Sequence, residues 1–162
     1  MSDGKIYYAQ REDNYYLKFV GDVRVTLCTG LNTYIKSIFD GDCIASVSVD
    51  FTETTAVDST TLGLLAKVAL HVLEREEIKA MLIVTNASLI RLVESMGFDE
   101  IFEIVPKFPE TPKQLAPLPC SKAPSDEARA QVIEAHKTLM SMNKKNMSAF
   151  SELVKALERE SS

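Results

Sequence analysis

The chain has 162 residues, 46% of them hydrophobic and 25% charged, which is the composition of a globular protein with room for one domain and a substantial core. No apolar stretch approaches the roughly 20 residues of a membrane span, and the first residues lack the apolar core of a signal peptide, so we expect a cytoplasmic protein without a membrane segment. The net charge is −5 and no Lys or Arg lies between Lys36 and Lys67, which argues against a nucleic-acid partner because phosphate binding needs clustered basic side chains.

Alternating apolar and polar residues predict strands, and apolar residues three or four positions apart predict helices. In chain order these patterns predict a hairpin of two strands, a helix, a strand, a helix, a strand, a short helix and a last strand. Their residue ranges are 5–10, 14–23, 27–39, 45–51, 60–74, 78–85, 88–96 and 101–105. A strand–helix–strand succession implies parallel strands joined by a right-handed crossover, so beside a hairpin the sheet is mixed. The fold class is α/β.

All six prolines lie within residues 106–124, where neither a helix interior nor a central strand can form. We predict a linker there, between an N-terminal domain, residues 1–105, and a helical C-terminal segment, residues 125–162. A polar stretch, residues 141–148, is either a weak point of one helix or a turn between two. The apolar stripe of this segment, which includes His136, must pack against its own domain, a second copy or a partner protein.

Conventional catalytic and metal sites are poorly represented. The two histidines, His71 and His136, lie in different predicted helices, where we expect both on the helix surface. The three cysteines, Cys28, Cys43 and Cys120, form no CxxC pair, so we expect reduced thiols. The glycines are scattered singly, which gives no phosphate-binding loop, and the carboxylates show no acid–base spacing. We therefore predict no catalytic residue, metal or cofactor, and a protein that is not an enzyme.

The helix at 60–74 is preceded by an acidic residue and begins with consecutive hydroxyls, in the sequence DSTTLG at 58–63. One side chain suffices to cap a helix, so capping by Asp58 or Ser59 explains only part of the pattern. The free N–H groups and dipole of a helix N-terminus would accommodate a phosphate on Ser59. That phosphate would add roughly −1.5 to −2 charges beside Asp58 and near Glu53. Such a site would control binding without unfolding the helix.

The stretch IASVSVDFTETTAVDSTTLGLLAKV, residues 44–68, resembles the core of the STAS domain of bacterial anti-sigma factor antagonists, in which Asp-Ser-Ser-Gly-Leu-Gly opens a long helix. FVGDV (19–23) and TNASLIRLVESMGFDEIFEIV (85–105) are similar to flanking elements of that family, so the resemblance covers about residues 5–105. It implies a STAS fold: a mixed four- to five-stranded sheet with helices packed mainly on one face. The C-terminal helical extension is absent from minimal members.

The resemblance implies a partner switch controlled by phosphorylation. In that family an anti-sigma factor with a histidine-kinase-like ATPase fold phosphorylates the Ser that follows the Asp, and a metal-dependent Ser/Thr phosphatase reverses the reaction. The unphosphorylated antagonist captures the anti-sigma factor and frees the sigma factor. Carried over, Ser59 is the phosphoacceptor and Asp58 its positioning neighbour. Thr60 replaces the second Ser and Thr61 stands where the family has glycine, so both are alternative acceptors.

We expect the partner to contact the start of this helix and one of its faces. The apolar face formed by Leu64, Val68 and His71 either belongs to the partner groove or packs on a neighbouring helix. The residues predicted to bind the partner are Asp58, Ser59, Thr60, Thr61, Leu62, Gly63, Leu64, Val68 and His71. Two other functions stay open: a constitutive STAS scaffold or accessory subunit of a transport or signalling complex, and a small-molecule-binding or catalytic α/β domain. The C-terminal segment is also a candidate for self-association.

Overall fold

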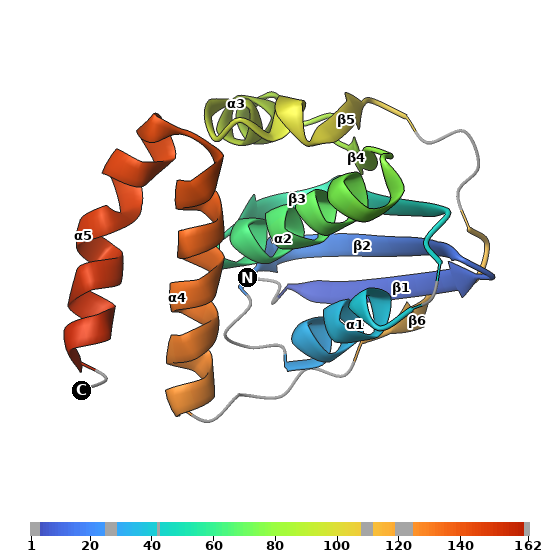
Figure 1. Ribbon diagram of the computed structural model, residues 1–162. Helices are drawn as coiled ribbons and strands as arrows, with labels where there is room; N and C mark the ends of the chain where they lie inside the picture. Colours follow the sequence, from blue (N-terminus) through green and yellow to red (C-terminus); the bar gives the residue numbers. More distant parts are fainter. Residues whose placement is uncertain (1–3, 25–28, 42, 108–111, 119–124, 161–162) are drawn as a thin grey trace.

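The structure is a computed structural model that describes residues 4–24, 29–41, 43–107, 112–118 and 125–160. Its centre is a six-stranded sheet, with the helices α1 and α2 lying over one face (Figure 1). The strands are β1 (Lys5–Arg11), β2 (Asn14–Val23), β3 (Ser46–Val57), β4 (Ala80–Ile83), β5 (Phe102–Val105) and β6 (Ala116–Pro117). The helices are α1 (Thr29–Phe39), α2 (Ser59–Glu76), α3 (Ala87–Ser95), α4 (Ser125–Met142) and α5 (Lys144–Glu160), with a 3-10 turn at Phe98–Glu100.

The predicted mixed α/β sheet is confirmed. The strand order is β5-β4-β3-β2-β1-β6, in which β1 and β2 form the antiparallel hairpin and β2, β3, β4 and β5 run parallel to one another. The apolar residues that alternate along β2 and β3 point to the helices and form the core; Phe19 and Phe51, both fully buried, meet edge to face with ring centroids 5.4 Å apart.

The sheet has one strand more than the predicted four to five, and the extra strand lies inside the predicted linker. Ala116 and Pro117 of β6 pair with Tyr8 and Tyr7 of β1. Proline is tolerated there because β6 is the edge of the sheet, where an N–H facing outward needs no partner. The next residue, Leu118, donates its N–H to the Ile6 carbonyl at 2.9 Å and is buried. A two-residue strand is too short to leave a periodic signal, which explains why it was not predicted.

Strand β3 continues to Val57, six residues beyond its predicted end at Phe51. Its second half, TETTAV, lacks regular apolar alternation and was therefore not predicted as a strand. This second half pairs with β2 in spite of two shifts in register, and the pairing ends with Val57 opposite Val23. Because both strands end together, Asp58 follows directly at the carboxyl edge of the sheet, and its N–H donates to the Val23 carbonyl at 3.3 Å. This edge positions the start of α2.

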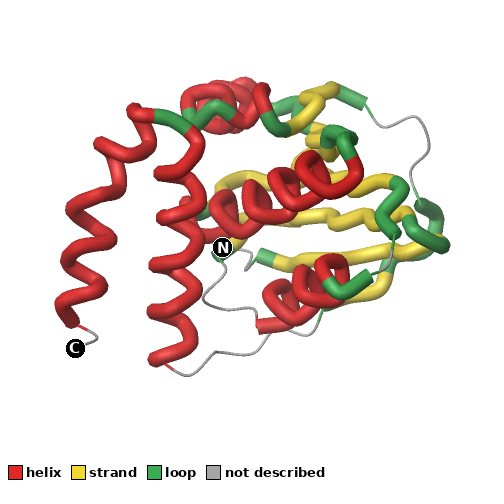
Figure 2. The backbone as a smooth tube through the Cα atoms, in the orientation of Figure 1, coloured by secondary structure: helices red, strands yellow, loops and turns green. Residues whose placement is uncertain are grey.

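The C-terminal segment forms two antiparallel helices, which answers the question of the polar stretch at 141–148: α4 ends at Met142, α5 begins at Lys144, and the chain turns at Asn143. We call α4 and α5 together the C-terminal hairpin. Figures 1 and 2 show α4 standing across the start of α2, with α5 on the outside. At the turn, the side chains of Asn143 and Asn146 both donate to the Met96 carbonyl, at 3.2 and 2.9 Å, next to the end of α3. Of the three surfaces considered for its apolar stripe, the hairpin thus packs on its own domain.

Candidate functional site

Asp58 is the residue that caps α2. Its backbone is extended (φ −82°, ψ 162°), and its carboxylate oxygen Oδ1 accepts the N–H of Thr61 at 2.8 Å and the hydroxyl of Thr61 at 2.5 Å. Of the two caps considered, Asp58 and Ser59, the structure has Asp58, and Ser59 is the first helical residue. The carboxylate satisfies one of the N–H groups that the first turn of a helix leaves without a partner.

The three hydroxyls at the start of α2 have different surroundings. Thr61 is completely buried and its hydroxyl bonds inward to the cap, while Thr60 is 6% exposed. Ser59 is only partly buried. Thr61, which stands where the resembling family has glycine, is accommodated because its hydroxyl reinforces the Asp58 cap. It adds nothing to the outer surface beside Ser59.

The Ser59 hydroxyl contacts the C-terminal hairpin. Its Oγ lies 2.7 Å from Nε2 of His136 in α4, and Nδ1 of the same ring lies 2.7 Å from the carbonyl of Val132. A carbonyl can only accept, so Nδ1 carries a proton; in the neutral imidazole Nε2 is then the acceptor and Ser59 the donor. The expectation that His136 lies on the helix surface is wrong. The side chain is 2% exposed and its ring packs edge-on against Phe150 of α5.

The backbones of α2 and α4 approach closely at Gly63. A Cβ built on Gly63 would lie 2.3 Å from the carbonyl oxygen of Ala135 and 2.6 Å from its carbonyl carbon, so only glycine permits this contact. One turn further along α2, Lys67 forms an ion pair with Glu134. The contact of α4 with α2 therefore includes a hydroxyl–imidazole hydrogen bond, a backbone-to-glycine contact and an ion pair, side by side.

The remaining residues predicted to bind a partner lie inside the domain. Leu62, Leu64 and Val68 are at most 1% exposed. His71 stacks on Phe39 of α1 with ring centroids 4.3 Å apart, and its Nε2 is buried without a hydrogen-bond partner among the described residues. This agrees with the alternative in which that face packs on a neighbouring helix. The partner-binding role of these residues stays a prediction, and in this conformation the three apolar side chains are not accessible.

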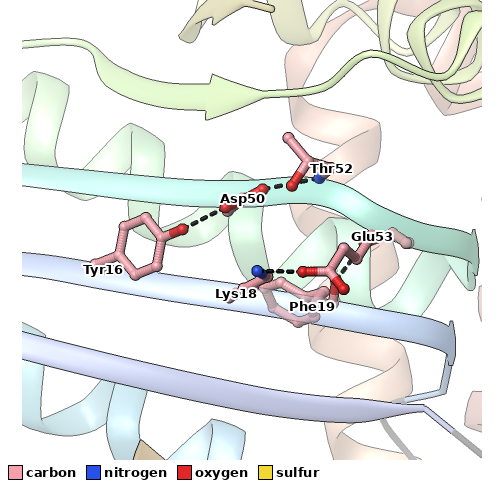
Figure 3. Close-up of polar contacts among 7 residues, drawn as sticks. Tyr16, Lys18, Phe19, Asp50, Thr52 and Glu53 are labelled. Carbon is pink, nitrogen blue, oxygen red and sulfur yellow. Dashed lines mark hydrogen bonds and ion pairs between the residues drawn. The ribbon is translucent and has the colours of Figure 1, made fainter. Parts of the chain in front are cut away.

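The acidic residues that precede the site are already paired in part. Figure 3 shows Asp50 of β3 accepting the hydroxyl of Tyr16, and Glu53 forming an ion pair with Lys18 of β2. Asp50 is 4% exposed and also accepts the N–H of Thr52 at 2.8 Å. Burial, together with the hydrogen bond to Asp50, raises the pKa of Tyr16 far above its ordinary value. Asp50 thus stabilises the sheet and contributes no exposed negative charge.

Within the described ranges, no three His, Cys, Asp or Glu side chains are grouped as they would be in a metal site, and no helix is long and apolar enough to cross a membrane. Cys43 is an exposed free thiol, while Cys28 and Cys120 lie outside the described residues.

Comparison with known proteins gives a family and a fold. The family model described as STAS domain matches residues 6–111, which is more than half of the chain. The crystal structure of an anti-sigma factor antagonist from Mycobacterium paratuberculosis is similar, with a TM-score of 0.53 and 15% sequence identity over 65% of this chain and 87% of that chain. At this identity the likeness shows the fold alone. No curated protein matches the chain. The C-terminal hairpin, which begins at Ser125, lies beyond the family match.

Proposed function

This chain belongs to the STAS domain family, and from that premise we propose that it is an anti-sigma factor antagonist. In the proposed switch the unphosphorylated protein binds an anti-sigma factor, and a phosphate on Ser59 releases it, which regulates sigma-factor-dependent transcription. The observation that carries the proposal is the position of Ser59. It is the first residue of α2, directly after the capping Asp58, where two adjacent parallel strands end.

Burial supports Ser59 as the phosphoacceptor over the two neighbouring threonines. A kinase must reach the acceptor hydroxyl, and Thr61 has its hydroxyl inside the cap with no exposed surface. Thr60 is 6% exposed. Ser59 is the least buried of the three, and its hydroxyl is bonded to another helix and not to its own.

A phosphate on Ser59 would change binding more than folding. The N–H groups of the first turn and the helix dipole stabilise negative charge at this end of α2. The added charge of roughly −1.5 to −2 would lie beside the Asp58 carboxylate and would repel a partner that fits the unmodified surface. The phosphate therefore acts on the surface potential while α2 keeps its cap.

The partners of the proposed switch are an anti-sigma factor with a histidine-kinase-like ATPase fold, which phosphorylates Ser59, and a metal-dependent Ser/Thr phosphatase, which removes the phosphate. We assign the protein itself a binding role in the cytoplasm and no catalytic activity. The Ser59–His136 pair resembles a nucleophile with its base. It lies inside the contact of two helices, however, and two surface hollows, one lined by residues of α4 and one by residues around the start of β1 and β6, include neither side chain.

The test is affinity capture of the full chain from its native cells, with phosphosite mass spectrometry on the recovered protein. Wild type and Ser59→Ala should recover an ATPase of the kinase-like fold, and Ser59→Asp should lose it. Ser88→Asp is the matched control, because Ser88 is an exposed serine in the first turn of α3 and receives the same charge. It should capture the ATPase like the wild type.

Phosphate mapped to Ser59, together with loss of capture in Ser59→Asp alone, supports the switch. Equal capture by all four proteins contradicts it. A chain that carries no phosphate in cells and co-purifies with membrane components would instead favour the constitutive scaffold.

A further inference from the structure

The C-terminal hairpin lies on the same face of α2 that the proposed switch uses. Positions four residues apart on a helix share one face, and three such positions of α2 contact three consecutive residues of α4. The pairs are Ser59 with His136, Gly63 with Ala135, and Lys67 with Glu134. The start of α2 is therefore occupied by a helix of the same chain.

Few residues of the docked hairpin are buried, although Ala135 and Leu139 join the core of the domain. Of the 18 residues of α4, only Ala135, His136 and Leu139 are buried, and of the 17 residues of α5, only Asn146 and Val154. One of its polar contacts, the Lys67–Glu134 ion pair, joins side chains that are 31% and 55% exposed, where water and salt weaken the attraction. Units with few buried apolar contacts open at a lower free energy than the core of the same protein.

The hairpin is also tethered close to its docking site. Leu118 is buried in the core of the domain, and α4 begins at Ser125. Only the six residues 119–124 connect the two. A helix on so short a tether has a high effective concentration at its site, so an external partner has to compete with it.

A phosphate on Ser59 does not fit the present contact with α4. Nε2 of His136 stands 2.7 Å from Oγ, in the space that the phosphorus and its oxygens would need. The phosphorylated Oγ carries no hydrogen, so the present hydrogen bond from the Ser59 hydroxyl to Nε2 is lost. To make room for the phosphate, α4 has to move away from Ser59, which gives up the close approach of Ala135 to Gly63.

We infer that α4 is a resident ligand of the Ser59 surface: the hairpin covers this surface in the resting protein, and its release exposes Ser59 to a kinase or a binding partner. Phosphate on Ser59 holds the hairpin open. The inference that α4 covers Ser59 depends only on the contacts between α2 and α4. Its consequence for phosphorylation rests on the proposed function.

The test measures how fast N-ethylmaleimide labels a cysteine at position 59 in the full chain. Ser59→Cys is placed in a background in which Cys28, Cys43 and Cys120 are serine. Ala135→Leu is added to push α4 away from Gly63, and Ala130→Leu is the matched control, the same substitution at an exposed position of the same helix. Labelling should become about tenfold faster or more with Ala135→Leu, because the opening equilibrium sets the rate, and should stay unchanged with Ala130→Leu.

Hydrogen–deuterium exchange of the same proteins shows whether the domain stays folded. Exchange in β2 and β3 should match that of the parent, while exchange in α4 and α5 accelerates. Should Ala135→Leu unfold the domain, His136→Ala replaces it and is judged by exchange in α4 and α5, because loss of the imidazole also changes the reactivity of a thiol at position 59.

Equal labelling rates in the Ala135→Leu and Ala130→Leu proteins, with the sheet intact, would overturn the covering, even where Ser59 is phosphorylated in cells. Faster labelling with Ala135→Leu in a chain that never carries phosphate would overturn the proposed switch and leave the covering in place.

Discussion

Gly63→Ala is the sharpest single test of the contact between α2 and α4. The new Cβ would lie 2.3 Å from the carbonyl oxygen, 2.6 Å from the carbonyl carbon and 2.7 Å from the Cβ of Ala135. Two of these atoms belong to the α4 backbone, so rotation of a side chain cannot relieve the clash. The hairpin has to move as a unit.

Two opposing effects set the size of the change. Overpacking costs typically about 1–3 kcal/mol, which weakens docking of the hairpin by about 5- to 150-fold. Inside α2 itself, alanine favours the helix over glycine by about 1 kcal/mol. The domain therefore keeps or gains stability while the hairpin loses its site.

Amide exchange followed by NMR separates the two effects, because it reports each element by itself. Amides of α4 should exchange about 5- to 150-fold faster in Gly63→Ala than in the wild type, and amides of β2 and β3 should not. Gly41→Ala is the matched control, since a Cβ there meets nothing closer than 3.2 Å and lies away from α4. If the amides of α4 exchange in Gly63→Ala at the same rate as in the wild type, the close contact between Gly63 and Ala135 does not hold the hairpin in place. Equal acceleration in β2 and β3 would show that the hairpin and sheet unfold as one unit.

Four further predictions concern stability. Tyr34→Phe should keep or raise the free energy of unfolding, by up to about 1 kcal/mol in urea titrations, because the Tyr34 hydroxyl is buried without a hydrogen-bond partner among the described residues. Tyr16→Phe should lower the free energy of unfolding by about 1–3 kcal/mol, because the buried Asp50 carboxylate loses the Tyr16 hydroxyl and keeps the N–H of Thr52 as a donor. Burial raises the pKa of Tyr34 far above its ordinary 10.0, so the folded state keeps the phenol proton to a higher pH than the unfolded chain. The contribution of Tyr34 to stability is therefore full below about pH 10 and falls as the pH rises above it. The fall should be less steep in Tyr34→Phe, and an unchanged alkaline slope would contradict this assignment. Glu77→Gly should raise the free energy of unfolding by about 0.5–1 kcal/mol, because Glu77 ends α2 in the left-handed region at φ 57°, which glycine adopts without strain. The increase should appear as a higher melting temperature.

Local patterns in the sequence were sufficient for the elements that build the domain. Alternation marked the first half of β3, helical spacing marked α2, and the motif at 58–63 indicated where α2 begins. These features depend on neighbours within a few residues, so the residues themselves carry the signal. The second half of β3 and the edge strand β6 were missed because pairing with a strand distant in sequence holds them, and not their own periodicity.

Local sequence patterns did not predict that α4 covers Ser59. His136 belonged to a stripe with a seven-residue period, which indicated that one side of the C-terminal helices is buried but not against what. Gly63 belonged to the motif, and the reason for a glycine there is the backbone of Ala135, far along the chain. Helical period determines which residues share a face. Which two faces meet depends on shape and chain path over the whole molecule, so only the tertiary structure decided that the hydroxyl of Ser59 bonds to His136.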